Sequence, residues 1–243
     1  MQFRGLTFMD FIRKISVEEL AKTIDHTILK PNSTLKDVLR VCRETLEYKF
    51  ALAMIPPTYV KRAVSEYSDC RVGTVIGFPL GFQTLKTKLK EAEEAISNGA
   101  SEIDMVMNIM EFKSGNKGYV LKEIEEIVNL AKSMGDIKVK VIIETGYLTD
   151  QEIIEASKIV KQAGANYVKS CTGFGPRGVT VHDVTLMFNA VNGEIGIKAA
   201  GGIRHAEDAI ALLIAGASRL GTSSGVKIIE EYRKLRETFG FKN

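Results

Sequence analysis

Cysteine is scarce in this sequence, with three residues among 243. Cys42, Cys70 and Cys171 are isolated from one another, and no CxxC spacing occurs. An odd, low count in a chain of this length argues against a disulfide framework and favours a reducing compartment. Charges interrupt the segment MQFRGLTFMDFIRKI at residues 1–15, which also lacks a small-residue cleavage site, so we expect no signal peptide. The expected location is the cytoplasm.

Long apolar runs and a strong excess of one charge are also missing. No stretch approaches the ~20 uninterrupted apolar residues of a membrane-spanning helix. The chain has 33 Lys and Arg against 30 Asp and Glu, and a net charge of +3 is too small to indicate nucleic acid binding. The densest charged runs mix both signs, as solvated helix faces do. We therefore expect a globular protein whose partners include neither nucleic acid nor a membrane.

The motifs of two common enzyme classes are absent. His26, His182 and His205 lie far apart, with no i, i+4 pair and no cysteine at ligand spacing, so no metal site is expected. No GxSxG elbow occurs, which argues against a serine hydrolase. His182 and His205 each open a predicted helix, where we expect them to be solvated.

What recurs is a helical segment that ends in Gly-Ala and is followed by a short apolar strand. The Gly-Ala pairs begin at Gly99, Gly164 and Gly216. Glycine suits a helix C-terminus, so each copy reads as the αβ step of a βα repeat. The unequal spacing indicates loops of variable length rather than a short-period solenoid.

Further strands are predicted between these repeats. They fall near residues 23–25 and at 50–55, 71–78, 138–145 and 196–200. The total of about eight strands alternating with helices in ~250 residues is that of an α/β TIM (β/α)8 barrel. An open doubly wound sheet is the alternative, but it usually needs fewer strands and a glycine-rich turn after the first.

No linker divides the chain. We expect one barrel domain over residues 1–243, with residues 1–22 as an additional N-terminal helical segment. The apolar stretch LTFMDFI (residues 6–12) within it could form an interface between subunits or cap the barrel floor. EFKSGNKGY (111–119) is predicted to be a βα loop with a flexible tip.

Two lysines stand near the ends of predicted neighbouring strands, where barrel active sites lie. Period-2 alternation places Lys169 and Lys198 on inward positions, and Asp104 lies two strands earlier. Burial and a neighbouring cation both favour a neutral amine, which is a nucleophile towards carbonyls. The alternative is that these lysines form structural ion pairs. That interpretation is retained for mid-strand Lys140, paired with Glu144 or Asp104, while Glu144 is a second candidate acid.

Small residues open into helices after the last two predicted strands, in AAGGIRHAEDA and GTSSGVKIIEE. Backbone N–H groups at such turns can approach an anion, and the helix dipole favours it. TIM barrels often bind phosphate at these two positions. A third glycine-rich turn, TGFGPRG, directly follows Ser170 and Cys171. The sequence therefore predicts a phosphate site beside the lysines.

Six segments together resemble the deoxyribose-phosphate aldolase family, in the family's order and approximate spacing. They are IDHTILKP, SEIDMVMN, VKVIIETGYL, GANYVKSCTGF, IKAAGGIRHAEDA and RLGTSSG. The resemblance spans about residues 20–225. It implies a class I aldolase that needs no metal or other cofactor and cleaves 2-deoxy-D-ribose 5-phosphate reversibly to glyceraldehyde 3-phosphate and acetaldehyde. It also implies a role in deoxyribonucleotide and carbohydrate degradation and a homodimer or homotetramer.

The resemblance also assigns roles to residues. It makes Lys169 the Schiff-base lysine, Lys198 the second lysine and Asp104 the proton-relay acid. The substrate and phosphate contacts that it implies are Asp25, Thr27, Thr172, Gly173, Gly201, Gly202, Gly221, Ser223 and Ser224.

The sequence departs from the family pattern in three places. Met54 stands where many members carry a cysteine, Phe174 where some carry a lysine, and the end TFGFKN lacks a C-terminal tyrosine. These changes should affect thiol sensitivity, phosphate binding and the rate of the proton step, respectively. Two other functions stay open, namely a Schiff-base aldolase for another sugar phosphate and a non-catalytic phosphosugar-binding barrel.

Overall fold

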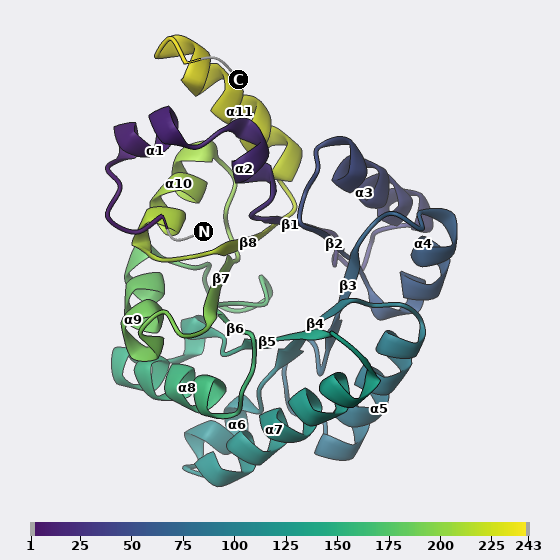
Figure 1. The fold of residues 1–243 in the computed structure, drawn as a ribbon. Coiled ribbons are helices and arrows are strands. Elements are labelled where there is room, and N and C mark those ends of the chain that lie inside the picture. The colour runs from purple at the N-terminus through teal and green to yellow at the C-terminus, as the bar shows by residue number, and fades with distance from the viewer. Residues whose placement is uncertain (1–2, 242–243) are drawn as a thin grey trace.

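The computed structural model describes residues 3–241, and its core is a closed barrel of parallel strands that pair in chain order (Figure 1). The strands are β1 (Ile24–Thr27), β2 (Leu52–Met54), β3 (Val72–Ile76), β4 (Glu102–Val106), β5 (Lys138–Ile142), β6 (Tyr167–Lys169), β7 (Gly196–Ala200) and β8 (Arg219–Thr222). Pairing of β1 with β8 closes the barrel. The predicted TIM barrel is confirmed, and the alternative of an open sheet is wrong.

Helices form a ring outside the barrel (Figure 1). Those that follow β1 to β8 include α3 (Leu35–Glu47), α4 (Val60–Glu66), α5 (Leu85–Ser97), α6 (Ile109–Lys113), α7 (Lys117–Met134), α8 (Asp150–Gln162), α9 (Val181–Val191), α10 (Ala206–Ala215) and α11 (Gly225–Thr238). Two short 3-10 turns, η1 (Pro57–Tyr59) and η2 (Thr145–Tyr147), interrupt the loops. Each longer helix buries an apolar face, as α3 does with Val38, Val41 and Cys42. Among residues 3–241, no helix is long and apolar enough to cross a membrane.

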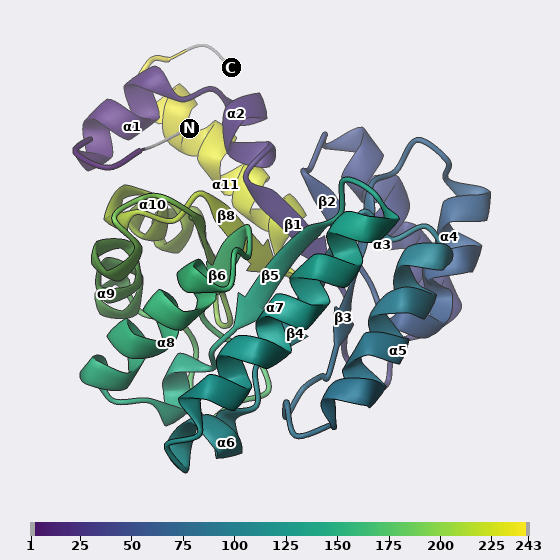
Figure 2. The same cartoon turned by 60° about the horizontal axis from the view of Figure 1, so that its bottom comes forward.

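Two short helices precede the barrel, α1 (Phe8–Lys14) and α2 (Val17–Ala21). They lie beside α10 and α11 in both views (Figures 1 and 2). Phe11 and Ile12 are fully buried there, and the hydroxyl of Tyr232 on α11 donates to the Ile15 carbonyl at 2.8 Å. The segment LTFMDFI therefore packs on the outer helices rather than across the barrel floor. The last two residues of the tail TFGFKN lie outside the described range.

The segment at 111–119 is largely helical, so the prediction of a flexible loop is wrong. Helix α6 covers its start and α7 begins at Lys117, which leaves residues 114–116 as the connection. Asn108 caps α6 by accepting from the Glu111 amide, and Phe112 is buried. The polar residues that suggested a loop belong to the solvent-exposed faces of α6 and α7, which are separated by only a short connection.

One glycine in the loop after β3 is required by its surroundings. Gly81 has φ +76, and a Cβ there would lie 2.1 Å from the carbonyl oxygen of Met107, just beyond β4. The neighbour is backbone and cannot move aside cheaply. This contact fixes the loop after β3 against the end of the strand that carries Asp104.

We expect Gly81→Ala to lower the free energy of unfolding by about 2–5 kcal/mol, from left-handed strain and overpacking together. Gly115→Ala is the matched control, because Gly115 has φ +83 but no atom near its would-be Cβ. It should cost about 1–2 kcal/mol from backbone strain alone. Urea unfolding of both variants measures the difference, and equal losses would show that the contact with Met107 costs nothing.

Candidate active site

Lys169 and Lys198 occupy paired positions on the neighbouring strands β6 and β7. Their Nζ atoms lie 2.7 and 2.6 Å, respectively, from the same oxygen, Oδ2 of Asp104 on β4. All three side chains point into the barrel and are almost completely buried. The structure thus brings together the three residues that alternation and the resemblance singled out.

A third lysine completes the shell of the Asp104 carboxylate. Lys140, which pairs with Asp104 in strand register, donates to Oδ1 at 2.9 Å and also lies 2.7 Å from Oε2 of Glu102. Burial alone would raise the pKa of Asp104, but the three ammonium groups outweigh it and hold that pKa well below its usual value. The acid is therefore ionised. The predicted pairing of Lys140 with Asp104 is confirmed, whereas Glu144 takes no part in it.

A second carboxylate lies below the lysines. Asp25 on β1 is fully buried, with Oδ2 at 2.5 Å from Lys198 Nζ and Oδ1 accepting from Arg219 on β8 at 2.7 Å. Arg219 and Glu102 were not predicted from sequence. The signal was present, because Glu102 shares the inward parity of Asp104, and Arg219 shares that of Gly221.

Lys198, one of the three lysines around Asp104, has a lowered pKa in this structure. Burial lowers its pKa, Asp104 and Asp25 counteract that effect, and Lys140 and Lys169 lower it further, to about 8. About a tenth of the Lys198 amine is therefore neutral at pH 7, and about half is neutral at pH 8. Such an amine can accept a proton from a neighbour or from bound water.

This shift predicts how stability depends on pH. The folded state binds the Lys198 proton more weakly than the unfolded chain does, so its burial penalty is present below pH 8 and is relieved as pH rises towards 10.5. The free energy of unfolding of the wild type, compared with that of Lys198→Met, should rise by on the order of 3 kcal/mol between pH 8 and pH 10.5. Urea unfolding of both proteins at pH 7.5, 9 and 10.5 measures the gain, and a constant gap would contradict it.

A cavity of about 670 Å³ opens above this cluster. Of the three lysines on Asp104, Lys169 lines it, whereas Lys140 and Lys198 lie behind. The other predicted contacts that line it are Thr27, Thr172, Gly173, Gly201, Gly202, Gly221, Ser223 and Ser224. Asp25 does not line the cavity and contacts Lys198 behind it instead.

The loop after Lys169 is held from below by Glu144. This carboxylate accepts from the Thr172 amide at 2.9 Å and from the Thr172 hydroxyl. A Cβ on Gly175 would meet Glu144 Oε1 at 2.6 Å, so the loop closes over the carboxylate only because that residue is glycine. Glu144, which the sequence left as a candidate acid, is thus placed to position the turn that carries Thr172 and Gly173.

The wall of the cavity formed by the turns before α10 and α11 has the features of an anion site. Gly201 and Gly202 have φ +96 and +83 in the turn before α10, and the Ser224 amide directly precedes α11. The Thr222 hydroxyl bridges the two turns, donating to the Ile203 carbonyl at 2.7 Å and accepting from Ser224 N. Two helix N-termini thus converge on one side of the cavity, as predicted for a phosphate.

The wall nearest β3 is apolar. Phe174, 47% exposed, packs edge-on against Phe78 with ring centroids 5.4 Å apart. Phe78 in turn packs against a separate apolar cluster inside the barrel, formed by Leu52, Met54 and Val75. The two sequence departures at Met54 and Phe174 therefore lie on the same side of the cavity. Met54 is fully buried within that cluster.

The far end of β4 is fixed by a buried ion pair between two outer helices. Lys88 on α5 lies 2.8 Å from Glu123 Oε1 on α7 and donates to the Val106 carbonyl at 2.8 Å. Glu123 accepts from the Asn108 amide. Burial lowers the pKa of Lys88 and raises that of Glu123. The pair secures the strand that carries Asp104.

One lysine lines an anion-suited cavity, with an acid and a second amine behind it, and these are the groups that a lyase acting on carbonyl compounds through an imine needs. The family of DeoC/LacD aldolases matches residues 20–231, and the chain belongs to this family.

Individual relatives agree with that assignment. Deoxyribose-phosphate aldolase of Thermoanaerobacter sp. (strain X514) is 54% identical over 219 residues, which cover 89% of this chain and 98% of the relative. Among solved structures, "QR15, an Aldolase" has a TM-score of 0.86 at 40% identity, covering 91% and 99% of the two chains. A tetrameric deoxyribose phosphate aldolase from Aeropyrum pernix has a TM-score of 0.85 at 34% identity, covering 95% and 100%.

Proposed function

We propose that this aldolase cleaves 2-deoxy-D-ribose 5-phosphate reversibly to glyceraldehyde 3-phosphate and acetaldehyde, through a Schiff base on Lys169. The observation that carries the proposal is that Lys169 alone of the three lysines on Asp104 lines the cavity. The names of the similar aldolases supply the substrate.

The first half of the reaction forms the covalent intermediate. The neutral Lys169 amine attacks the C1 aldehyde of the open-chain sugar phosphate, and the carbinolamine loses water to give a protonated imine. The C3 hydroxyl then loses its proton to a water molecule held by Asp104 and Lys198. The electrons of that O–H bond form the C3 carbonyl, and those of the C2–C3 bond pass to the imine.

The second half releases the products. Glyceraldehyde 3-phosphate leaves, and an enamine of acetaldehyde stays on Lys169. Protonation at C2 regenerates the imine, and water hydrolyses it to acetaldehyde and the free amine. Lys198 suits the proton steps, because a pKa of about 8 lets it both donate and accept near neutral pH.

The phosphate is proposed to bind at the turns before α10 and α11, where Gly201, Gly202, Ser223 and Ser224 line the cavity. Holding the far end of the substrate there places C1 beside Lys169 and so lowers the entropic cost of attack. Thr27, Thr172, Gly173 and Gly221 are proposed as further contacts, and Asp25 as a support for Lys198.

Trapping with borohydride tests the function. The protein is incubated with deoxyribose 5-phosphate or with acetaldehyde, reduced and digested, and the peptides are weighed. We expect an N-ethyl adduct on the peptide that contains Lys169. Fructose bisphosphate should give neither adduct nor turnover. Substrate binding with no adduct would instead support a non-catalytic phosphosugar-binding barrel.

The assembly and location are also proposed. Phe8 and Met9 on α1 remain exposed beside the buried Phe11 and Ile12, and they offer an apolar patch for a homodimer or homotetramer. The Aeropyrum pernix relative, whose structure is tetrameric, provides a precedent for such an assembly. The buried free thiols of Cys42, Cys70 and Cys171 suit a reducing cytoplasm. Sedimentation velocity measures the state of assembly.

A further inference from the structure

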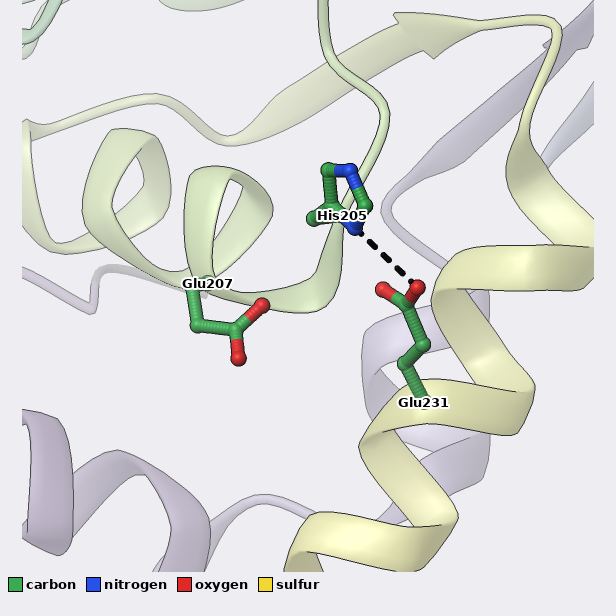
Figure 3. Close-up of side chains that lie close together, drawn as sticks. All are labelled: His205, Glu207 and Glu231. Carbon is green, nitrogen blue, oxygen red and sulfur yellow. Dashed lines mark hydrogen bonds and ion pairs between the residues drawn. The ribbon is translucent and has the colours of Figure 1, made fainter.

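Three possible metal ligands meet where α10 and α11 begin to run side by side, outside the cavity that Lys169 lines. His205 occupies the N-cap position of α10, Glu207 lies in its first turn, and Glu231 comes from α11 (Figure 3). One ligand atom from each lies within 4.8 Å of the other two. We propose that these residues form a binding site for a divalent transition-metal ion of the zinc type.

The donor set matches that chemistry. One imidazole nitrogen and two carboxylate oxygens are typical zinc ligands, at about 2.0–2.2 Å from the ion, which puts tetrahedral ligands about 3.3–3.5 Å apart. His205 Nδ1 already lies 3.1 Å from Glu231 Oε1. Only Glu207, which is exposed and points towards the same gap, must turn inward (Figure 3). The remaining coordination positions face solvent and suit water.

Two of the ligands are held in place before any ion binds. Glu231 accepts from the Ala206 amide through Oε2 at 2.9 Å, which leaves Oε1 directed at His205. Asp208 accepts from the His205 amide and so fixes the backbone that carries the imidazole. Contacts of this kind orient ligands and raise metal affinity.

One cation competes for the site. Lys227 Nζ lies 3.6 Å from Glu231 Oε1, one helical turn earlier on α11. Half of the Lys227 side chain is exposed, so it can swing into solvent when an ion arrives. The proposal therefore predicts that removing this lysine tightens metal binding, the opposite of what removal of a ligand does.

An ion at this position would act on the cavity through geometry. Ile203 and Arg204, which line the cavity, directly precede His205, and α11 begins two residues after cavity-lining Ser223. An ion that links α10 to α11 would fix the distance between the two turns that form the anion-binding wall of the cavity. We therefore expect bound zinc to raise the melting temperature and to tighten the binding of inorganic phosphate.

The test uses the full chain, stripped with a chelator and titrated with Zn²⁺ by calorimetry, with Co²⁺ absorption as a probe of coordination. We expect one ion per chain. His205→Asn puts a favourable N-cap residue at this position while removing the imidazole, so it should fold normally and weaken binding by about 10- to 100-fold or more. Lys227→Met should tighten it.

His182→Asn is the matched control, because His182 is also exposed in the first turn of a helix and pairs with a carboxylate, Asp150. It should leave zinc binding unchanged. Equal affinity in wild type and His205→Asn, or equal losses in His205→Asn and His182→Asn, would overturn the proposal. So would a Co²⁺ spectrum of purely octahedral hydrated ion. None of these readouts depends on aldolase activity.

Discussion

Lys169→Leu should abolish carbon–carbon bond cleavage, with kcat reduced by about 10⁴-fold or more, as expected when a covalent nucleophile is removed. Leucine retains apolar bulk but cannot form an imine, and neither Lys140 nor Lys198 lines the cavity to replace it. A coupled assay of glyceraldehyde 3-phosphate release measures the rate, and borohydride trapping measures the adduct.

Loss of activity through unfolding must be separated from loss of the nucleophile. Lys88→Met is the matched control, since Lys88 is just as buried but lies outside the cavity. Burial already raises the pKa of its partner Glu123, so that carboxyl can take up a proton when the lysine is replaced. We expect a lower melting temperature but an intact adduct at Lys169. An adduct on another lysine in Lys169→Leu would contradict the assignment.

Asp104→Asn should affect stability and activity together. The substitution is isosteric, but it leaves the ammonium groups of Lys140, Lys169 and Lys198 without the carboxylate that they share. Breaking a buried ion network on one side costs about 3–5 kcal/mol. Loss of the proton relay should lower kcat by about 10²- to 10⁴-fold. Urea unfolding and steady-state kinetics measure the two effects.

The stability loss in Asp104→Asn should shrink at high pH, because the buried amines then become neutral without cost. Asp150→Asn is the surface control, since both members of its pair with His182 are more than 60% exposed. It should change the unfolding free energy by no more than about 0.5 kcal/mol. A pH-independent loss in Asp104→Asn would show that packing, rather than charge, is responsible.

The barrel and its central residues could be predicted because periodicity and strand ends are local properties. The predicted strand 196–200 matches β7 in full, and the inward parity of Lys169 and Lys198 needs no knowledge of distant contacts. The glycines before β4, β6 and β8 likewise mark helix ends, as Gly216 does after α10.

What escaped prediction depends on contacts between distant segments. Arg219 meets Asp25 across 194 residues of sequence, and only closure of the barrel between β8 and β1 brings them together. Glu144 has a left-handed backbone conformation, and its carboxylate accepts a hydrogen bond from the Thr172 amide. Nothing in the sequence VIIETGY predicts that conformation. The helical character of residues 111–113 depends on the Asn108 cap, a local signal that the surrounding polar residues obscured.

The buried ion network inside the barrel also sets how many protons it can hold. Its buried members are three carboxylates and four basic groups, namely Asp25, Glu102 and Asp104 with Lys140, Lys169, Lys198 and Arg219. The half-exposed Arg71 pairs with Glu102 from outside this set, at 2.8 Å. With every carboxylate ionised and every basic group protonated, these seven groups carry one positive charge in excess, and a low-dielectric interior disfavours that excess.

This excess favours the loss of a proton from one of the lysines, because arginine keeps its proton, and the pKa of Lys198 is lowered to about 8. A neutral amine in this core is thus favoured by the number of charges as well as by the individual neighbours of Lys198. In the proposed reaction Lys169 becomes a cationic imine, and that charge favours loss of the proton from Lys198. Imine formation and proton transfer from Lys198 are then coupled, and they should respond together to any substitution that changes the charge of this core.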